Sequence, residues 1–329
     1  MHEKYIKRCF YLAQLGEGYV SPNPMVGGVL VYNDEIIGEG YHKQFGEAHA
    51  EVNCINSVAE NHKKNIEHST LYINLEPCNH YGKTPPCTDL ILKHKIKNVV
   101  ISNIDNHDLV AGKGIQKLLD NGVNVIHGIL KEQGELLNKR FFISNKLQRP
   151  YIILKWAESK DGFIGKENER IQISGETSQI IAHQLRKLSD AILVGKNTVL
   201  SDNPSLTTRL VTGKNPDRII WSNSWNEIHS NFKIFDNQAK TYITKDFKLN
   251  TMTEILKKIY ALNYGILLIE GGAKTINYFI ENNLWNEAIV FQSKNKMLLN
   301  GISAPIISGK YIDSRTENNS DFILQYSNY

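Results

Sequence analysis

The sequence has no long hydrophobic stretch. None of its apolar runs approaches the roughly 20 residues that a helix needs to cross a bilayer. The first ten residues carry charges at Glu3, Lys4, Lys7 and Arg8, with no apolar run behind them. This pattern is unlike a secretory signal. We therefore expect a cytoplasmic protein that does not associate with membranes.

Cysteine is scarce, and so is an excess of charge of either sign. Only four of the 329 residues are cysteines, too few for a disulfide framework in a chain of this size. The formal net charge of +4 suits an anionic small molecule but is too small to indicate nucleic-acid binding. The composition, 41% hydrophobic and 22% charged, is that of a globular protein with room for two domains.

Strand-like and helix-like segments alternate along the chain, which is typical of layered α/β domains. The first half is expected to hold helices near 4–16, 47–60 and 88–94, a hairpin over 28–41, and strands over 71–75, 99–102 and 123–127. A strongly apolar strand at 151–156 begins a second alternating unit. We predict two domains, residues 1–148 and 149–329, and expect the polar tail after about Gly309 to be poorly ordered.

Three short segments of the first half combine metal-ligand and acid–base chemistry. His49-Ala50-Glu51 begins a predicted helix, Cys78 follows a predicted strand, and Cys87 opens the next helix. One imidazole and two thiolates suit zinc, and three protein ligands leave a fourth position for water, as in catalytic sites. Glu51 is two residues from His49 and can move the proton of that water.

Each of these residues has an ordinary structural explanation when taken alone. An isolated H-x-E is usually a solvated helix face, and intracellular cysteines are usually small buried hydrophobes, which is how we interpret Cys9 and Cys54. The conjunction of H-x-E with two downstream Pro-Cys pairs is instead typical of zinc-dependent base deaminases. Here eight residues separate Cys78 from Cys87, where the usual spacing is two.

The surrounding segments resemble one family, the bifunctional riboflavin biosynthesis deaminase-reductases. The resemblance rests on Ser21-Pro22-Asn23-Pro24, Gly40-Tyr41-His42, His49-Ala50-Glu51 and the stretch 76–87. It implies a cytidine-deaminase-like α/β/α domain that deaminates a diaminopyrimidinone carrying a ribosylamino 5′-phosphate. In this family His49, Cys78 and Cys87 would bind zinc and Glu51 would be catalytic. The substrate contacts that it implies are Asn23, His42, His80, Lys83 and Thr84.

The second half lacks the G-x-G-x-x-G dinucleotide fingerprint after its first strand. It does contain an apolar strand at 267–269 that runs into Gly271-Gly272 and then a predicted helix. Glycines let backbone N–H groups approach a phosphate, and the start of a helix favours its charge. This signal is weak alone, because strand–Gly-Gly–helix turns are common for structural reasons.

Residues 155–162 and 195–209 resemble the reductase half of the same family, which has a dihydrofolate-reductase-like α/β fold. The resemblance implies NADPH-dependent reduction of the ribosyl group to ribityl, and a homodimer formed through this half. The NADPH contacts that it implies are Ala157, Thr198, Asp202, Ser222, Gly272, Ala273, Lys274 and Thr275. The implied substrate contacts are Arg186, Leu206, Arg209 and Glu270. A pair of arginines suits a phosphate, since guanidinium groups bind it bidentately.

The second half also departs from the family pattern. A Ser-x-Trp-Ile-Thr stretch is expected near residue 170, where this chain has Arg170-Ile171-Gln172-Ile173-Ser174. Three alternatives therefore stay open. They are a monofunctional deaminase with a degenerate reductase half, a nucleic-acid base deaminase, and a zinc-stabilised binding protein without activity. The long cysteine spacing and the small charge disfavour the second, and Glu51 disfavours the third.

Overall fold

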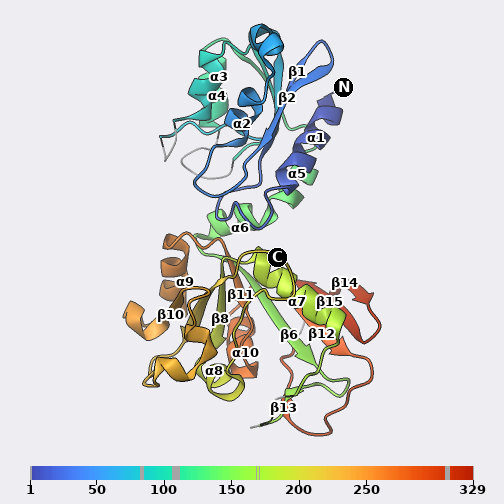
Figure 1. The fold of residues 1–329 in the computed structure, drawn as a ribbon, viewed down its shortest axis with the longest axis vertical. Coiled ribbons are helices and arrows are strands. Elements are labelled where there is room, and N and C mark those ends of the chain that lie inside the picture. The colour runs from blue at the N-terminus through green and yellow to red at the C-terminus, as the bar shows by residue number, and fades with distance from the viewer. Residues whose placement is uncertain are drawn as a thin grey trace. The chain divides into compact units, whose positions relative to one another are not determined.

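The computed structural model describes residues 2–81, 85–105, 112–167, 169, 171–307 and 312–328, with the backbone alone for Ser230 and residues 312–314. The chain divides into two compact units, Met1–Leu147 and Gln148–Tyr329 (Figure 1). No helix in these described ranges is long and apolar enough to cross a membrane.

The first unit is an α/β/α sandwich. Its elements are α1 (His2–Gln14), β1 (Gly27–Tyr32), β2 (Glu35–Tyr41), α2 (Ala50–Asn56), a 3-10 helix (Glu60–His68), β3 (Thr70–Leu75), α3 (Cys87–Lys93), β4 (Asn98–Asn103), α4 (Lys113–Asp120), β5 (Asn124–His127), α5 (Lys131–Leu137) and α6 (Lys139–Leu147). The sheet order is β2-β1-β3-β4-β5, with β3, β4 and β5 parallel and β1 antiparallel to both of its neighbours.

Alternation along the strands of this sheet supplies two separate apolar layers, because successive side chains point to opposite faces. In β1, Leu30 joins the core beneath α2, α3 and α4, while Val29 and Val31 join the core beneath α1. The helix predicted over 47–60 is shorter than expected. It ends at Asn56, where the Ser57 hydroxyl donates to the Cys54 carbonyl and accepts the Glu39 N–H.

The second unit has an eight-stranded sheet in the order β10-β9-β8-β11-β6-β12-β15-β14, of which the first six are parallel (Figure 1). Its strands are β6 (Tyr151–Glu158), β8 (Ala191–Gly195), β9 (Asp217–Trp221), β10 (Thr241–Ile243), β11 (Ile266–Ile269), β12 (Glu287–Ser293), β14 (Ile312–Glu317) and β15 (Asp321–Ser327), and β7 (Phe163–Gly165) pairs apart from it with β13 (Ile302–Ser303). The helices are α7 (Glu176–Leu188), α8 (Lys196–Asp202), α9 (Met252–Ala261) and α10 (Ala273–Glu281), with 3-10 turns at His229–Asn231, Lys233–Phe235 and Thr244–Phe247.

The two faces of this sheet differ in character. Alternate residues of β6, Ile152, Leu154 and Trp156, belong to one large apolar core together with α9 and α10. Lys155 points to the opposite face, on the side of α7. A single strand thus contributes both to the core and to a polar group on the other face.

The expectation of a poorly ordered tail is wrong for residues 312–328. β15 pairs with β12 along its whole length, and Leu324 is buried in the core of the sheet. Asp321, which is fully buried, accepts hydrogen bonds from the Gly175 N–H and the Ser178 hydroxyl at the start of α7. The tail looked polar because an antiparallel edge hairpin buries only alternate residues.

Candidate functional sites

Three segments of the first unit meet at the carboxyl end of β3. His49 caps the start of α2 in an extended conformation, and Cys87 is the first residue of α3. Cys78 follows β3 by three residues, and its carbonyl accepts the Thr88 N–H. The local folding of two helix starts around one strand end therefore brings the predicted zinc ligands together.

The ligand atoms of His49, Cys78 and Cys87 all lie within 4.8 Å of one another. The His49 Nδ1 lies 3.5 Å from the Cys78 Sγ and 3.4 Å from the Cys87 Sγ. Among the residues that the structure describes, this is the one such cluster of His, Cys, Asp or Glu side chains. Two thiols and one imidazole at these separations fit zinc, and they leave room for a further ligand.

The pKa values of the two thiols in this cluster are shifted in opposite directions. The side-chain hydrogen bond with Cys87 is the main cause that lowers the pKa of the Cys78 thiol, and the backbone N–H of Cys87 also donates to the Cys78 Sγ at 3.3 Å. The same contact with Cys78, together with burial, raises the pKa of Cys87. Cys78 therefore ionises first, and the thiolate form is the one that binds metal.

Glu51 is almost completely buried, with 3% of its surface exposed, on the first turn of α2 beside this cluster. Burial is the main cause that raises the pKa of its carboxyl to about 7. A carboxyl with a pKa near neutrality can both accept and release a proton at working pH, which is what a proton shuttle requires. Its neighbour in space, Cys87, contributes a side-chain hydrogen bond that favours the ionised form.

Two predicted substrate contacts lie next to the cluster. The buried His42 ring lies edge-on to the His49 ring, with centroids 5.5 Å apart. Its Nδ1 lies 3.1 Å from the Ala48 carbonyl oxygen and its Nε2 lies 3.1 Å from the Asn23 amide nitrogen. Burial lowers the pKa of His42. The ring is therefore neutral, with Nδ1 donating to Ala48 and Nε2 accepting from Asn23.

The other predicted contacts of this half are less well defined. His80 is exposed, and Lys83 and Thr84 lie outside the described residues. Sequence reasoning gave no role to Glu76, although it precedes Pro77-Cys78. Its buried carboxylate accepts N–H groups from Asp105, Gly112, Gly114 and Ile115 at 2.8–3.2 Å. Glu76 thus anchors the strand end that carries Cys78 to the start of α4. The acidic residue after an apolar strand was the available signal.

In the second unit, the predicted NADPH contacts gather at one edge of the sheet. β6, β8, β9 and β11 are parallel, so their carboxyl ends share an edge, which is the usual ligand edge of such sheets. Ala157 lies near the end of β6. Thr198 and Asp202 lie on α8 directly after β8. Ser222 follows β9, and Gly272, Ala273, Lys274 and Thr275 form the start of α10 after β11.

Close backbone approach explains the glycines at this edge. A Cβ on Gly195 would lie 2.6 Å from the Thr275 hydroxyl oxygen, and one on Gly271 would lie 2.6 Å from the Thr275 Cβ. The Thr198 hydroxyl accepts the Gly272 N–H at 3.0 Å, which ties α8 to the first turn of α10. Glycine backbone and a nine-residue helix whose start faces this edge fit the phosphates of a dinucleotide.

The predicted substrate contacts Arg186 and Glu270 form a buried ion pair. The Arg186 Nε and Nη2 donate to the two Glu270 carboxylate oxygens at 2.8 and 2.7 Å, and Nη1 donates to the Thr207 carbonyl at 3.0 Å. Lys155 joins them, 3.5 Å from Glu270. Burial acts to raise the pKa of Glu270, but the charges of Arg186 and Lys155 outweigh it and hold the pKa at about 2. Sequence reasoning missed Lys155, although a lysine inside an apolar strand was a visible signal.

Arg209 is the exposed cation of this region, in the loop after α8, and its Nη1 lies 3.5 Å from the Thr207 hydroxyl. Leu206 is buried three residues before it. Of the two family positions that departed from the expected pattern, Arg170 lies outside the described residues. Gln172 is exposed, and its amide donates to the Ser174 carbonyl.

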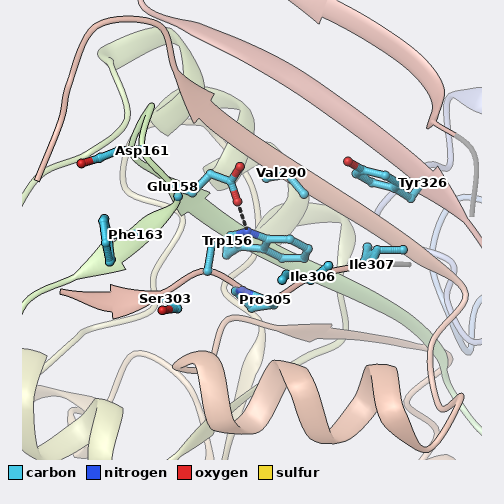
Figure 2. Close-up of a pocket in the computed structure, with 12 residues that line it drawn as sticks. Trp156, Glu158, Asp161, Phe163, Val290, Ser303, Pro305, Ile306, Ile307 and Tyr326 are labelled. Atoms are coloured by element: carbon cyan, nitrogen blue, oxygen red, sulfur yellow. Dashed lines mark hydrogen bonds between the residues drawn. The ribbon is translucent and has the colours of Figure 1, made fainter. Parts of the chain in front are cut away.

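A separate pocket of about 460 Å³ lies at the end of β6 on the α10 face, lined by Trp156, Glu158, Phe163 and Tyr326 among others (Figure 2). The Glu158 carboxylate accepts hydrogen bonds from the Trp156 indole and from the Gln292 amide. None of the predicted cofactor or substrate residues is among the described residues that line it.

These features define two classes of domain. The first unit is a cytidine-deaminase-like zinc domain, and the second is a dinucleotide-binding α/β domain. The sequence agrees: residues 1–103 match the cytidine and deoxycytidylate deaminase zinc-binding region, and residues 150–293 match the RibD C-terminal domain. The predicted fold class is confirmed.

Whole-chain relatives name the family. The riboflavin biosynthesis protein RibD of Aquifex aeolicus is 37% identical over 310 residues, covering 88% of this chain and 86% of that protein. The RibD protein of Bacillus amyloliquefaciens is 38% identical, covering 95% and 90%. The chain belongs to the RibD family.

Solved structures agree over the full length. A deaminase/reductase from Thermotoga maritima superposes with a TM-score of 0.85 at 31% identity, covering 100% of this chain and 99% of that one. The RibD of Acinetobacter baumannii gives a TM-score of 0.88 at 26% identity, with the same coverage. The protein is a bifunctional deaminase and reductase of riboflavin biosynthesis that uses zinc and NADPH, so the alternatives of a nucleic-acid deaminase and of an inactive zinc protein are set aside.

Proposed function

We propose that residues 1–148 deaminate 2,5-diamino-6-ribosylamino-4(3H)-pyrimidinone 5′-phosphate, and that residues 149–329 reduce the ribosyl group of the product to ribityl. The Thermotoga maritima relative is described as a diaminohydroxyphosphoribosylaminopyrimidine deaminase and 5-amino-6-(5-phosphoribosylamino)uracil reductase. The observation that carries the deaminase assignment is the cluster of His49, Cys78 and Cys87 beside the buried Glu51.

In the deaminase, His49, Cys78 and Cys87 would hold the zinc ion. When bound, zinc supplies Lewis-acid activation of a water molecule near neutral pH. Glu51 accepts the proton of the attacking water at its carboxylate and delivers it to the substrate, because its raised pKa suits both transfers. The neutral His42 and Asn23 are hydrogen-bonded to each other beside His49, and they orient the pyrimidine.

In the reductase, Gly272, Ala273, Lys274 and Thr275 would hold the phosphates of NADPH, and the other cofactor contacts would be Ala157, Thr198, Asp202 and Ser222. Bound NADPH supplies the hydride. Leu206, Arg209 and Glu270 contact the substrate, with the exposed Arg209 at its 5′-phosphate. Arg186 contacts the substrate as well, and its ion pair with Glu270 and its bond to the Thr207 carbonyl fix its position.

The same proposal includes the remaining substrate contacts, the cellular location and the oligomeric state of the enzyme. His80, Lys83 and Thr84 would contact the deaminase substrate from the insert between the two cysteines. The enzyme is a cytoplasmic homodimer that associates through its second unit and binds neither nucleic acid nor membrane. Sedimentation analysis of the whole chain and of residues 149–329 tests the dimer.

The decisive experiment supplies the zinc-loaded protein with the diaminopyrimidinone phosphate and follows ammonia, then adds NADPH and follows its absorbance. Ammonia release followed by stoichiometric NADPH oxidation supports both halves of the proposal. Ammonia without NADPH oxidation, even when the deaminated intermediate is added directly, would contradict the proposed substrate of the second unit. No ammonia from the zinc-loaded protein would contradict the substrate proposed for the first.

A further inference from the structure

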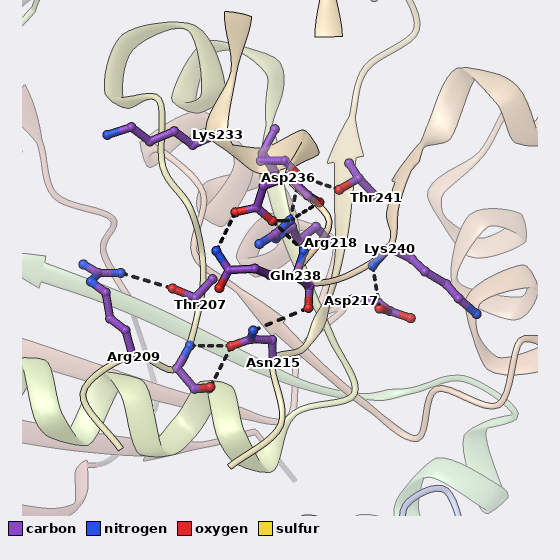
Figure 3. A network of polar contacts seen from close by, with 12 residues as sticks. Thr207, Arg209, Asn215, Asp217, Arg218, Lys233, Asp236, Gln238, Lys240 and Thr241 are labelled. Atoms are coloured by element: carbon purple, nitrogen blue, oxygen red, sulfur yellow. Dashed lines mark hydrogen bonds and ion pairs between the residues drawn. The ribbon is translucent and has the colours of Figure 1, made fainter. Parts of the chain in front are cut away.

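The loop that carries Arg209 is held in place by one face of α7. Arg209 is the second residue of a turn closed by the Val211 N–H, which donates to the Thr208 carbonyl at 3.0 Å. The Thr208 N–H and hydroxyl both bond the Asn215 side chain, at 2.8 and 2.7 Å, and so tie the two ends of the loop together. Figure 3 shows Thr207, Arg209 and Asn215 of this loop.

Three residues of α7 meet this loop from a single helix face, since positions i, i+3 and i+4 lie together. The Arg186 Nη1 donates to the Thr207 carbonyl at 3.0 Å. Lys187 lies against Gly213, where an added Cβ would come 2.5 Å from the Lys187 Cγ. Between Thr207 and Gly213 on the loop lies Leu210, the residue after Arg209. Its N–H donates to the His183 Nδ1 at 3.4 Å.

The environment of His183 suits an acceptor rather than a charged group. The residue is buried, with 4% of its surface exposed. Burial, followed by the charges of Arg186 and Arg209, lowers the pKa of the ring to about 4. A neutral imidazole keeps one nitrogen free to accept a hydrogen bond, whereas the protonated ring has only donors.

We propose that His183 is a positioning residue of the reductase, which fixes the Thr208–Val211 turn so that the Arg209 guanidinium meets the phosphate of the substrate. The inference rests on the proposed function, in which Arg209 binds that phosphate. His183 itself does not touch the reacting atoms. Its loss therefore affects substrate binding and leaves the chemical step intact.

Two substitutions at the same position isolate the hydrogen bond. H183L removes the acceptor at similar volume, and H183N keeps an acceptor close to the position of Nδ1. We expect H183L to raise the KM for the phosphorylated intermediate roughly fivefold, the size expected for one neutral hydrogen bond, with kcat unchanged. The inhibition constant of inorganic phosphate should rise by the same factor, and H183N should restore both values.

The matched control is Q184L, which places the same leucine at the next, exposed position of α7 and should behave as the wild type. R209A distinguishes the role proposed for Arg209 from the role proposed for His183. If R209A leaves the KM unchanged, the assigned role of Arg209 fails, and the inference fails with it. If R209A raises the KM but folded H183L does not, the proposed function stands and the role of His183 is wrong.

Hydrogen exchange tests the hydrogen bond between His183 and Leu210 even if H183L does not fold. In the wild-type protein the Leu210 amide should be protected from exchange, because its N–H is bonded to His183. Exchange at the rate of an unstructured amide would overturn the inference without any variant.

Discussion

The two active sites of this chain are built in different ways. The proposed deaminase site takes its metal ligands and its proton shuttle from side chains between residues 49 and 87, where two helix starts meet one strand end. The proposed reductase site draws on residues between 157 and 275 that lie at or just after the ends of four different strands, and glycines allow close backbone approach there. Side-chain chemistry leaves a motif in the sequence, while a surface of backbone N–H groups leaves little more than glycines.

The same difference determines how strongly a single substitution affects each site. A metal site depends on each of its ligands, because zinc held by two groups is bound far more weakly than by three. A distributed cofactor site shares its binding energy among many weak contacts, so that each substitution costs a modest factor. Substitutions in the two sites test this contrast.

The largest effect is expected for Cys87→Ala. The variant should lose zinc and with it all measurable ammonia release, while NADPH oxidation with the deaminated intermediate stays at the wild-type rate. Metal analysis and the two assays on one preparation check this. Full zinc content in the variant would show that Cys87 is not a ligand.

Glu51→Gln comes next. It keeps the volume and the buried position of the side chain but cannot carry the proton, so deamination should fall by roughly 10²–10⁴-fold. Zinc content and reductase activity should match the wild type, which distinguishes this variant from Cys87→Ala. Turnover within twofold of the wild type would exclude Glu51 as the shuttle.

Glu270→Gln should act mainly on the stability of the second unit. It leaves the buried Lys155 and Arg186 charges without their carboxylate, a change that costs about 3–5 kcal/mol of unfolding free energy when a buried pair is broken. The pKa of Glu270 is lowered to about 2 in the folded state. The ionised carboxylate therefore stabilises the fold fully above its unfolded pKa of about 4.3, and this contribution is lost as the pH falls towards 2.

Denaturant unfolding of the second unit between pH 6 and pH 2 measures this contribution. The wild type should lose stability over the acid end of that range more steeply than Glu270→Gln. Glu281→Gln, at an exposed glutamate on α10, serves as the control and should follow the wild type. Parallel pH curves for wild type and Glu270→Gln would contradict the ion pair.

The smallest effect is expected for Thr198→Val. This isosteric change removes the acceptor of the Gly272 N–H and loosens the first turn of α10, so the KM for NADPH should rise roughly fivefold. Asn197→Ala, exposed on the same helix, should leave the KM unchanged. A loss as large as that of Cys87→Ala would mean that the reductase site is not distributed as described.

Much of the first unit could be predicted from the sequence, because its signals are local. The spacing of His49, Glu51, Cys78 and Cys87 indicated a cluster, and the structure brings these side chains together. Residues that act by reaching distant backbone gave no such signal. Glu76 accepts N–H groups more than 25 positions along the chain, and His183 accepts the N–H of Leu210 across a loop.

The errors in the second unit have a common cause. The 312–328 segment looked disordered because β15 depends on partners outside its own hairpin, β12 and the start of α7, that lie earlier in the sequence. Lys155 was given no role because its counter-charge, Glu270, follows another strand, β11, more than 100 positions along the chain. Periodicity describes one element at a time and contains no information about which elements meet.

The pairing of β15 with β12 has a consequence for how the protein is made. The first unit draws all of its strands from the first 127 positions, so it can fold while the rest of the chain is still being synthesised. The second unit cannot complete its sheet, or fix the start of α7 through Asp321, until residues 321–327 have left the ribosome. On each nascent chain the deaminase therefore matures before the reductase, in the order in which the two reactions follow one another.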